Sequence, residues 1–302
     1  MRSVHVAIAV LVAAVWGLNF VIIEVGLEEF PPLLLSALRY LLALLPLAVM
    51  RGGRPAPWRW ILAAGTAIGL VQFSLLFIGM DVGMPAGLAS VLMQTQALFT
   101  IAFAVPLLHE RLRPAQGAGV VLALAGPILV AGGLDGGATV SGFLLVLGAA
   151  AGWGAGNICV RAAKPDDPVR LMTWICLVPP LPLLGLSLAV EGPSEIGTAL
   201  SGLDLGGLGA VAYLAFVATT LGWGLWGELL KRYSAAVVAP FSMLVPVFGL
   251  AFAALLLGEP LTVRRLVATA LVIGGVLITL RAARAPQATP PVAAAAPAPT
   301  CA

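Results

Sequence analysis

The chain has 302 residues, of which 61% are hydrophobic and only 10% are charged. Soluble domains average about 45–50% apolar residues. The 13 acidic and 16 basic side chains are too few to cover a globule of this size in water. The composition therefore excludes a soluble protein and predicts one that lies in a membrane. Spans of about 20 residues each leave no room for a separate soluble domain.

Long apolar stretches follow one another along the whole chain. They are interrupted mainly by Gly, Ala and Pro, whereas a transmembrane β-barrel would need short segments that alternate apolar and polar residues. The predicted fold is therefore all-α, with ten transmembrane helices. These helices are expected at residues 5–27, 33–50, 60–80, 86–108, 114–132, 141–163, 169–190, 206–228, 235–257 and 263–281. The first stretch leads directly into further spans, so we expect it to be helix 1 rather than a signal peptide.

The basic residues predict the orientation, because Lys and Arg near short loops are held on the cytoplasmic side. With the N-terminus inside, the basic residues that fall on the cytoplasmic side are Arg2, Arg51, Arg54, Arg59, Arg111, Arg113, Arg161, Lys164, Arg170, Lys231, Arg232, Arg281 and Arg284. Only Arg264 and Arg265 then lie outside, and Arg39 lies within a span. Both termini are therefore expected in the cytoplasm of a bacterial cell, with the chain in the inner membrane.

An internal repeat divides the chain into two halves. The segment LLHERL (107–112) matches LLGEPL (256–261), so that Glu110 corresponds to Glu259 at an offset of 149 residues (259 − 110). At this offset Phe99 meets Phe248 and Gly126 meets Gly275. Because each half holds five helices, the second half enters the membrane upside down, as in carriers built from inverted repeats. The predicted halves are 5–132 and 141–281, and residues 285–302 form an Ala/Pro-rich tail that we expect to be disordered.

Several motifs resemble the drug/metabolite transporter superfamily, and within it the ten-helix EamA family. They are WGLNFVIIEVGL (16–27), PPLLLSALRY (31–40), MPAGLASVLMQTQALFT (84–100), HERL (109–112), GWGAGNICVR (152–161), YLAFVATTLGWGLWGELLKRY (213–233) and APFSMLVPVFGLAFAALLLGE (239–259). The fourth, eighth and ninth helices look most like the O-acetylserine/cysteine exporter branch. The resemblance implies an efflux carrier for small amino-acid metabolites. One departure is Glu24, where relatives of this type often have Lys.

Two charged residues are expected inside the membrane. Glu24 lies near the outer end of the first predicted helix, and Arg39 lies about 9 Å inside the outer end of the second, at 1.5 Å per residue. Because a lone charge in hydrocarbon is costly, an ion pair between them is one interpretation. The other is functional: Arg39 binds a substrate carboxylate, while Glu24 attracts an amino group or carries a proton.

Amides and aromatic side chains at membrane depth are the remaining candidates for a substrate site. Uncharged amides there must find hydrogen-bond partners, either on other helices or on a substrate. An amide-lined cavity would suit a small zwitterion, because amides both donate and accept. The candidates are Asn19, Gln72, Gln94, Gln96 and Asn157 among the amides and Trp153, Tyr213 and Trp223 among the aromatics.

Other functions fit the sequence less well. Glu228 is followed by Lys231 and Arg232 at i+3 and i+4, which favours an ion pair at a helix end, with a proton-carrying role as the alternative. His5 and His109 lie at span ends. The three cysteines, Cys159, Cys176 and Cys301, form no metal-binding pattern, and no cofactor, metal or nucleic acid is expected. The sequence has no nucleophile or metal motif of the kind that a membrane enzyme needs. It also has no polar lining of the kind that a channel needs. The sequence thus predicts an exporter of O-acetylserine- or cysteine-like metabolites, with other amino acids, purines or drugs as the alternative.

Overall fold

The computed structural model describes residues 1–50, 52–108, 114–132 and 137–284. Every regular element in this part of the chain is a helix, as the apolar composition predicts. Seven helical stretches are long and apolar enough to cross a membrane, namely Ser3–Glu29, Trp58–Asp81, Ala86–Leu108, Val140–Ala163, Pro168–Val190, Leu205–Arg232 and Val237–Leu256. Two shorter apolar helices, Pro32–Leu47 and Gln116–Ala131, and the 22-residue helix α17 (Val263–Arg284) occupy the other three predicted spans.

The first half contains five crossing segments, most of them interrupted. They are α1 (Ser3–Glu29), α2 and α3 (Pro32–Ala43 and Leu45–Val49), α4, η1 and α5 (Trp58–Ala64, Gly65–Gln72 and Phe73–Asp81), α6 and α7 (Ala86–Met93 and Gln96–Leu108), and α8 (Pro114–Ala131). The middle of the third segment, η1, is a π-helix. The HERL motif falls in residues 109–113 and lies outside the described residues.

The second half repeats this pattern of interruptions. Its segments are α9 (Val140–Ala163), α10 and α11 (Pro168–Ile175 and Pro180–Val190), α13, η2 and α14 (Leu205–Ala212, Tyr213–Leu221 and Gly222–Arg232), α15 and α16 (Ala235–Ser242 and Val245–Leu256), and α17. Its third segment again has a π-helical middle, η2, and its fourth is again broken halfway. A short exposed helix, α12 (Pro193–Ser201), was not among the predicted elements.

Equivalent residues of the two halves make equivalent close contacts with the other half. A methyl group on Gly17 of α1 would lie 2.5 Å from Phe248 Cβ on α16, and one on Gly154 of α9 would lie 2.7 Å from Phe99 Cβ on α7. Phe99 and Phe248 are the pair related by the 149-residue offset. The first helix of each half therefore packs backbone to backbone against the fourth segment of the other half, which small residues permit in membranes.

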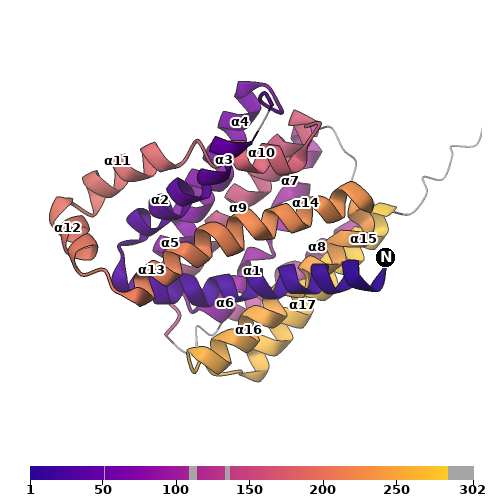
Figure 1. Ribbon diagram of the computed structural model, residues 1–302. Coiled ribbons are helices and arrows are strands. Elements are labelled where there is room, and N and C mark those ends of the chain that lie inside the picture. Colours follow the sequence, from indigo (N-terminus) through magenta and orange to yellow (C-terminus); the bar gives the residue numbers. More distant parts are fainter. Residues whose placement is uncertain (51, 109–113, 133–136, 285–302) are drawn as a thin grey trace, which may run out of the picture.

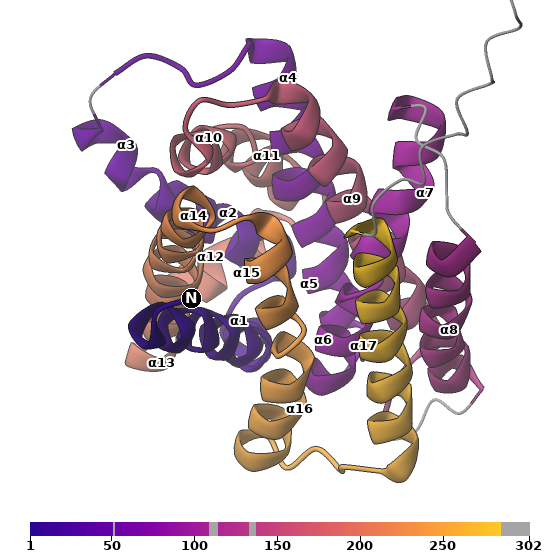
Figure 2. The same ribbon diagram turned by 90° about the vertical axis from the view of Figure 1, so that its right-hand side faces the viewer.

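The fifth helices form a second close pair. Helices α8 and α17 lie side by side, and Figure 2 shows them at the edge of the bundle. Gly126 faces Val272, and its repeat partner Gly275 faces Ala123, so the two contacts exchange under the 149-residue offset. A side chain at either glycine would separate the two helices.

One end of the bundle carries both described ends of the chain. Figure 1 shows the start of α1 and the end of α17 on the same side, with α12 at the opposite side. We call the first side the N-terminal end and the other the far end. At the far end, Glu191 accepts hydrogen bonds from the backbone N–H groups of Leu33 (2.6 Å) and Leu34 (3.2 Å), and Glu259 accepts one from Gly87 (3.1 Å). These two glutamates of the second half thus cap the starts of two first-half helices, where N–H groups have no partner within the helix.

Candidate functional site

A cavity with about 670 Å³ of empty space, its opening included, lies between the two halves. We call it the central cavity. Residues from seven crossing segments line it: Trp16, Asn19, Phe20, Arg39, Gln72, Phe73, Leu76, Ser90, Met93, Gln94, Gln96, Trp153, Trp223, Ser242 and Val245.

Arg39 is the one charged residue in this lining, and it is almost completely buried, with 3% of its surface exposed. Its Nε donates to Thr219 Oγ1 at 2.9 Å, and its guanidinium carbon lies 4.0 Å from the centre of the Phe73 ring. The Nη1 nitrogen has no hydrogen-bond partner among the described residues. A fixed cation with a free donor is the arrangement that a carboxylate recognises.

The two π-helical segments hold Arg39 in place. Thr219 lies in η2, and its hydroxyl donates to the Leu214 carbonyl five residues earlier at 2.7 Å, which leaves its oxygen to accept from Arg39. Phe73 follows directly on η1. A π-helix shifts the usual i−4 ladder and is frequent at functional sites. The interruptions in the third segments of both halves therefore meet at the same guanidinium.

The amides of the cavity fall into two groups. Gln72 is fully buried, and neither its Oε1 nor its Nε2 has a partner among the described residues; Asn19 Oδ1 is in the same state. Gln94, in contrast, donates to the backbone carbonyl of Ser242 at 2.8 Å. Gln94 and Ser242 lie at the breaks in the fourth segments of the two halves, so this bond joins one break to the other. Unpartnered amides are costly in a dry interior, so Asn19 and Gln72 are the groups most available to a ligand.

Three tryptophans form one wall of the cavity. The Trp223 ring lies 5.2 Å from Trp16 and 5.9 Å from Trp153, measured between ring centres. The Trp16 indole donates to the Ala218 carbonyl at 3.0 Å, which fixes this ring on η2. Indole rings supply rigid apolar surface, so this wall would contact the uncharged part of a ligand.

Seven of the nine candidate substrate-binding residues predicted from the sequence meet in this cavity, and two do not. Asn157 is not in the lining, and its Nδ2 donates to Gln96 Oε1 at 2.8 Å and to Thr100 Oγ1 at 3.1 Å. Tyr213 donates to the Val15 carbonyl at 2.9 Å and does not line the cavity. Both residues join helices rather than face the cavity.

The structure contradicts the interpretation that Glu24 and Arg39 form an ion pair. Arg39 bonds to Thr219 instead, while Glu24 lines a separate cavity at the far end together with Glu28 and Glu259. The two residues therefore line different cavities. Glu228 does form the expected helix-end pairs, 3.4 Å from Lys231 and 3.5 Å from Arg232, with half of its side chain exposed.

Some lining residues escaped the sequence reasoning. Trp16, Phe73, Ser90 and Ser242 look like ordinary helix residues in the sequence. Trp16 had a detectable signal, because WGLN in the first half corresponds to WGAGN in the second, where Trp153 was a candidate. The others had none, since a serine or phenylalanine at membrane depth is usually a packing residue.

The model of the EamA-like transporter family matches residues 4–132 and again residues 140–281. The chain belongs to the EamA-like transporter family. Each half carries one match, and the matched ranges begin and end within one residue of the halves drawn from the sequence repeat. Membership agrees with the all-helical membrane fold and with a transporter.

Curated relatives agree with this assignment. A Salmonella typhimurium protein named "Probable amino-acid metabolite efflux pump" is 45% identical over 280 residues, which cover 90% of this chain and 93% of the relative. An Escherichia coli protein of the same name is 41% identical over the same shares. The E. coli "Uncharacterized inner membrane transporter YedA" is 28% identical over 88% of this chain and 87% of its own length.

A solved structure titled "Crystal structure of protein" has a TM-score of 0.63 and 21% identity, and it covers 94% of this EamA family chain and 99% of its own. At this identity the likeness concerns the fold alone.

No group of three or more His, Cys, Asp or Glu side chains that could hold a metal ion occurs in the described ranges.

Proposed function

We propose that this EamA-family protein exports small zwitterionic amino-acid metabolites, of the O-acetylserine and cysteine kind, by alternating access across the bacterial inner membrane. The observation that carries the proposal is the buried Arg39 in the central cavity, whose Nη1 lacks a partner among the described residues. The names of the relatives from Salmonella and E. coli support the same class of substrate.

The chemistry of the cavity matches a zwitterion. Arg39 would bind the α-carboxylate, and the oxygens of Asn19 and Gln72 would accept from the α-ammonium group. The tryptophan wall would contact the side chain of the substrate. A single arginine among uncharged amides suits release as well as binding, because it offers one strong contact rather than several.

The two halves supply the conformational change in this proposal. The pairs Gly17–Phe248 and Gly154–Phe99 are equivalent contacts on either side of the cavity. Exchange of the two halves' conformations would open one end of the bundle as it closes the other. Neither Glu24 nor Glu228 lines the central cavity, so the proposal assigns no group that carries a coupled proton.

We place the N-terminal end in the cytoplasm. This end carries Arg54, Arg59, Arg161 and Lys164 in its loops and helix ends, and basic residues near short loops stay inside. Alkaline phosphatase fused after residue 302 would be inactive in this orientation, and an active fusion would contradict it.

Counterflow in proteoliposomes tests the proposed function. Vesicles that hold the purified protein and unlabelled O-acetylserine or cysteine should accumulate the radiolabelled amino acid, with and without an imposed pH gradient. Arg39→Gln should weaken substrate binding about 10- to 150-fold, because a hydrogen bond to a charged group contributes about 1.5–3 kcal/mol. Arg59→Gln is the matched control, since Arg59 is exposed at the N-terminal end.

Two results would overturn the proposal: no counterflow of either amino acid by the folded wild-type protein, or wild-type binding by Arg39→Gln. The tryptophan wall favours one alternative, a planar ligand such as a purine or an aromatic amino acid, because flat rings stack on indoles. Competition of the labelled counterflow by these compounds and by cationic drugs separates the two.

A further inference from the structure

A second cavity lies on the other side of Arg39. It has about 530 Å³ of empty space, its opening included, and we call it the side chamber. Arg39, Phe73 and Trp223 line both the side chamber and the central cavity. The remaining lining of the side chamber comes from α2, α3, η1, α10, η2 and α14 and includes Val169, Thr173, Thr220 and Gly224.

The side chamber contains acceptors as well as the shared cation. Thr173 and Thr220 each donate their hydroxyl to a backbone carbonyl, Thr173 to Val169 at 3.2 Å and Thr220 to Ala215 at 3.0 Å. Once these protons are committed, the hydroxyl oxygens can act only as acceptors. A chamber with one guanidinium at its inner wall and hydroxyl acceptors around it has the groups that bind a carboxylate and an ammonium together.

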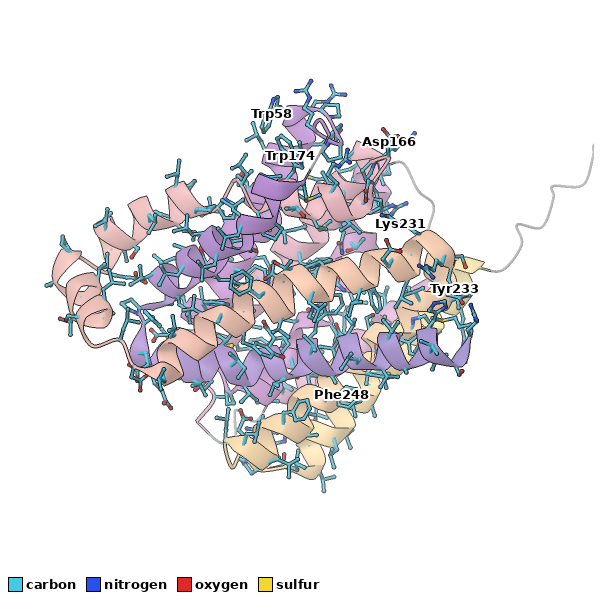
Figure 3. The ribbon with its side chains drawn as sticks, viewed as in Figure 1. Trp58, Asp166, Trp174, Lys231, Tyr233 and Phe248 are labelled. Atoms are coloured by element: carbon cyan, nitrogen blue, oxygen red, sulfur yellow. The ribbon has the colours of Figure 1, made fainter. Side chains whose placement is uncertain are left out.

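The position of the side chamber places it on a route to the N-terminal end. Beyond it, α10 and α14 touch: Gly227 packs directly against Val169, and a side chain at Gly227 would collide with it. Lys231 forms an ion pair with Asp167 at 3.3 Å just past this contact. Figure 3 shows Lys231 near the end of α14, on the same side of the bundle as Asp166.

We propose that the side chamber is a second binding station for the same zwitterion, between the central cavity and the N-terminal end. The substrate would keep its carboxylate on Arg39 while the rest of the molecule moves from one cavity to the other. Separation of α10 from α14 at Val169 and Gly227 would then connect the station with the surface. This inference rests on the proposed function, because it takes the same ligand.

Gly224 offers a direct test. It lines the side chamber, and a Cβ there would have no heavy atom within 4 Å, so the side chain of Gly224→Leu starts in open space and takes up room in the chamber. Gly209 on α13 also has open space around it but is exposed outside both cavities, so Gly209→Leu is the matched control for a new leucine in the same crossing segment. Both variants are compared with wild type for equilibrium binding of labelled O-acetylserine in detergent and for counterflow in proteoliposomes.

The expected result is binding within about twofold of wild type for both variants, with counterflow reduced at least tenfold for Gly224→Leu alone. Wild-type counterflow by Gly224→Leu would overturn the side chamber as a station. Equal loss of binding and counterflow would also overturn it, because the leucine would then act on the central cavity. If the wild-type protein itself neither binds nor transports the amino acid, the proposed function fails. This result differs from the two outcomes that overturn only the side chamber, because in both of those the wild-type protein binds and transports.

Discussion

Thr219 allows the role of Arg39 to be tested without removing the charge. Thr219 is 5% exposed, and its oxygen is the acceptor for Arg39 Nε at 2.9 Å. Thr219→Val keeps the shape of the side chain but removes this acceptor. The guanidinium then loses the contact that fixes its plane, while its charge and its packing on Phe73 remain.

The size of the effect follows from the bond that is lost. A hydrogen bond to a charged group contributes about 1.5–3 kcal/mol, and 1.4 kcal/mol is a tenfold change in affinity. Since the guanidinium can still meet a carboxylate in other orientations, we expect the lower part of this range: a KM about tenfold higher in counterflow, with the maximal rate within about twofold of wild type. Thr219→Ser restores the oxygen and should restore the KM.

The assay is the initial rate of O-acetylserine counterflow as a function of concentration, with thermal melting in detergent to show that each variant folds. Thr269→Val is the matched control, because Thr269 is also buried but donates to the Arg265 carbonyl and lines neither cavity. A wild-type KM for Thr219→Val would refute the positioning role. An equal defect in Thr219→Ser and Thr219→Val would show that the methyl packing matters rather than the hydroxyl.

Three further predictions concern the frame around the cavity. Gly154→Val should lower the melting temperature, because overpacking against Phe99 costs about 1–3 kcal/mol. Gly117→Val, with open space around it, should leave the melting temperature unchanged. Equal melting temperatures of the two variants would contradict the close contact between Gly154 and Phe99. Glu259→Gln breaks the 2.7 Å ion pair between Glu259 and Arg265, whose side chain is 3% exposed, and should lower the free energy of unfolding by about 3–5 kcal/mol. An unchanged midpoint of denaturant unfolding would count against the role of Glu259 as a helix cap. For Asp167, burial alone would raise the pKa, but the backbone N–H groups of Arg170 and Val169 and the nearby Lys231 outweigh burial and lower the pKa. The ionised Asp167 therefore stabilises the fold above about pH 4, and this stabilisation is lost as the pH falls through the lowered pKa. Asp167→Asn should flatten the acid limb of a melting curve measured against pH, and an unchanged limb would speak against this role.

The sequence predicted much of the central cavity. Seven of its lining residues were candidates, namely Asn19, Arg39, Gln72, Gln94, Gln96, Trp153 and Trp223. They were found because polar or amphipathic side chains at membrane depth are few and each needs a partner. The same reasoning also selected Asn157 and Tyr213, which satisfy their hydrogen bonds on neighbouring helices. Depth in a span identifies which side chains need a partner but not where that partner is.

The sequence by itself determined the all-helical membrane fold, and it predicted the approximate ends of the helices and a division into two halves. In hydrocarbon each segment must satisfy its own backbone hydrogen bonds, so an apolar run of sufficient length has one outcome. The offset of 149 residues then fixed which helices correspond.

The tertiary structure alone decided which polar groups meet. Glu24 lines a cavity at the far end, whereas Arg39 lines the central cavity. The hydrogen bond from Arg39 to Thr219 and the Gln94–Ser242 bond between two helix breaks join residues more than 100 positions apart. Because those contacts arise from packing between the halves, no local pattern in either half predicts them.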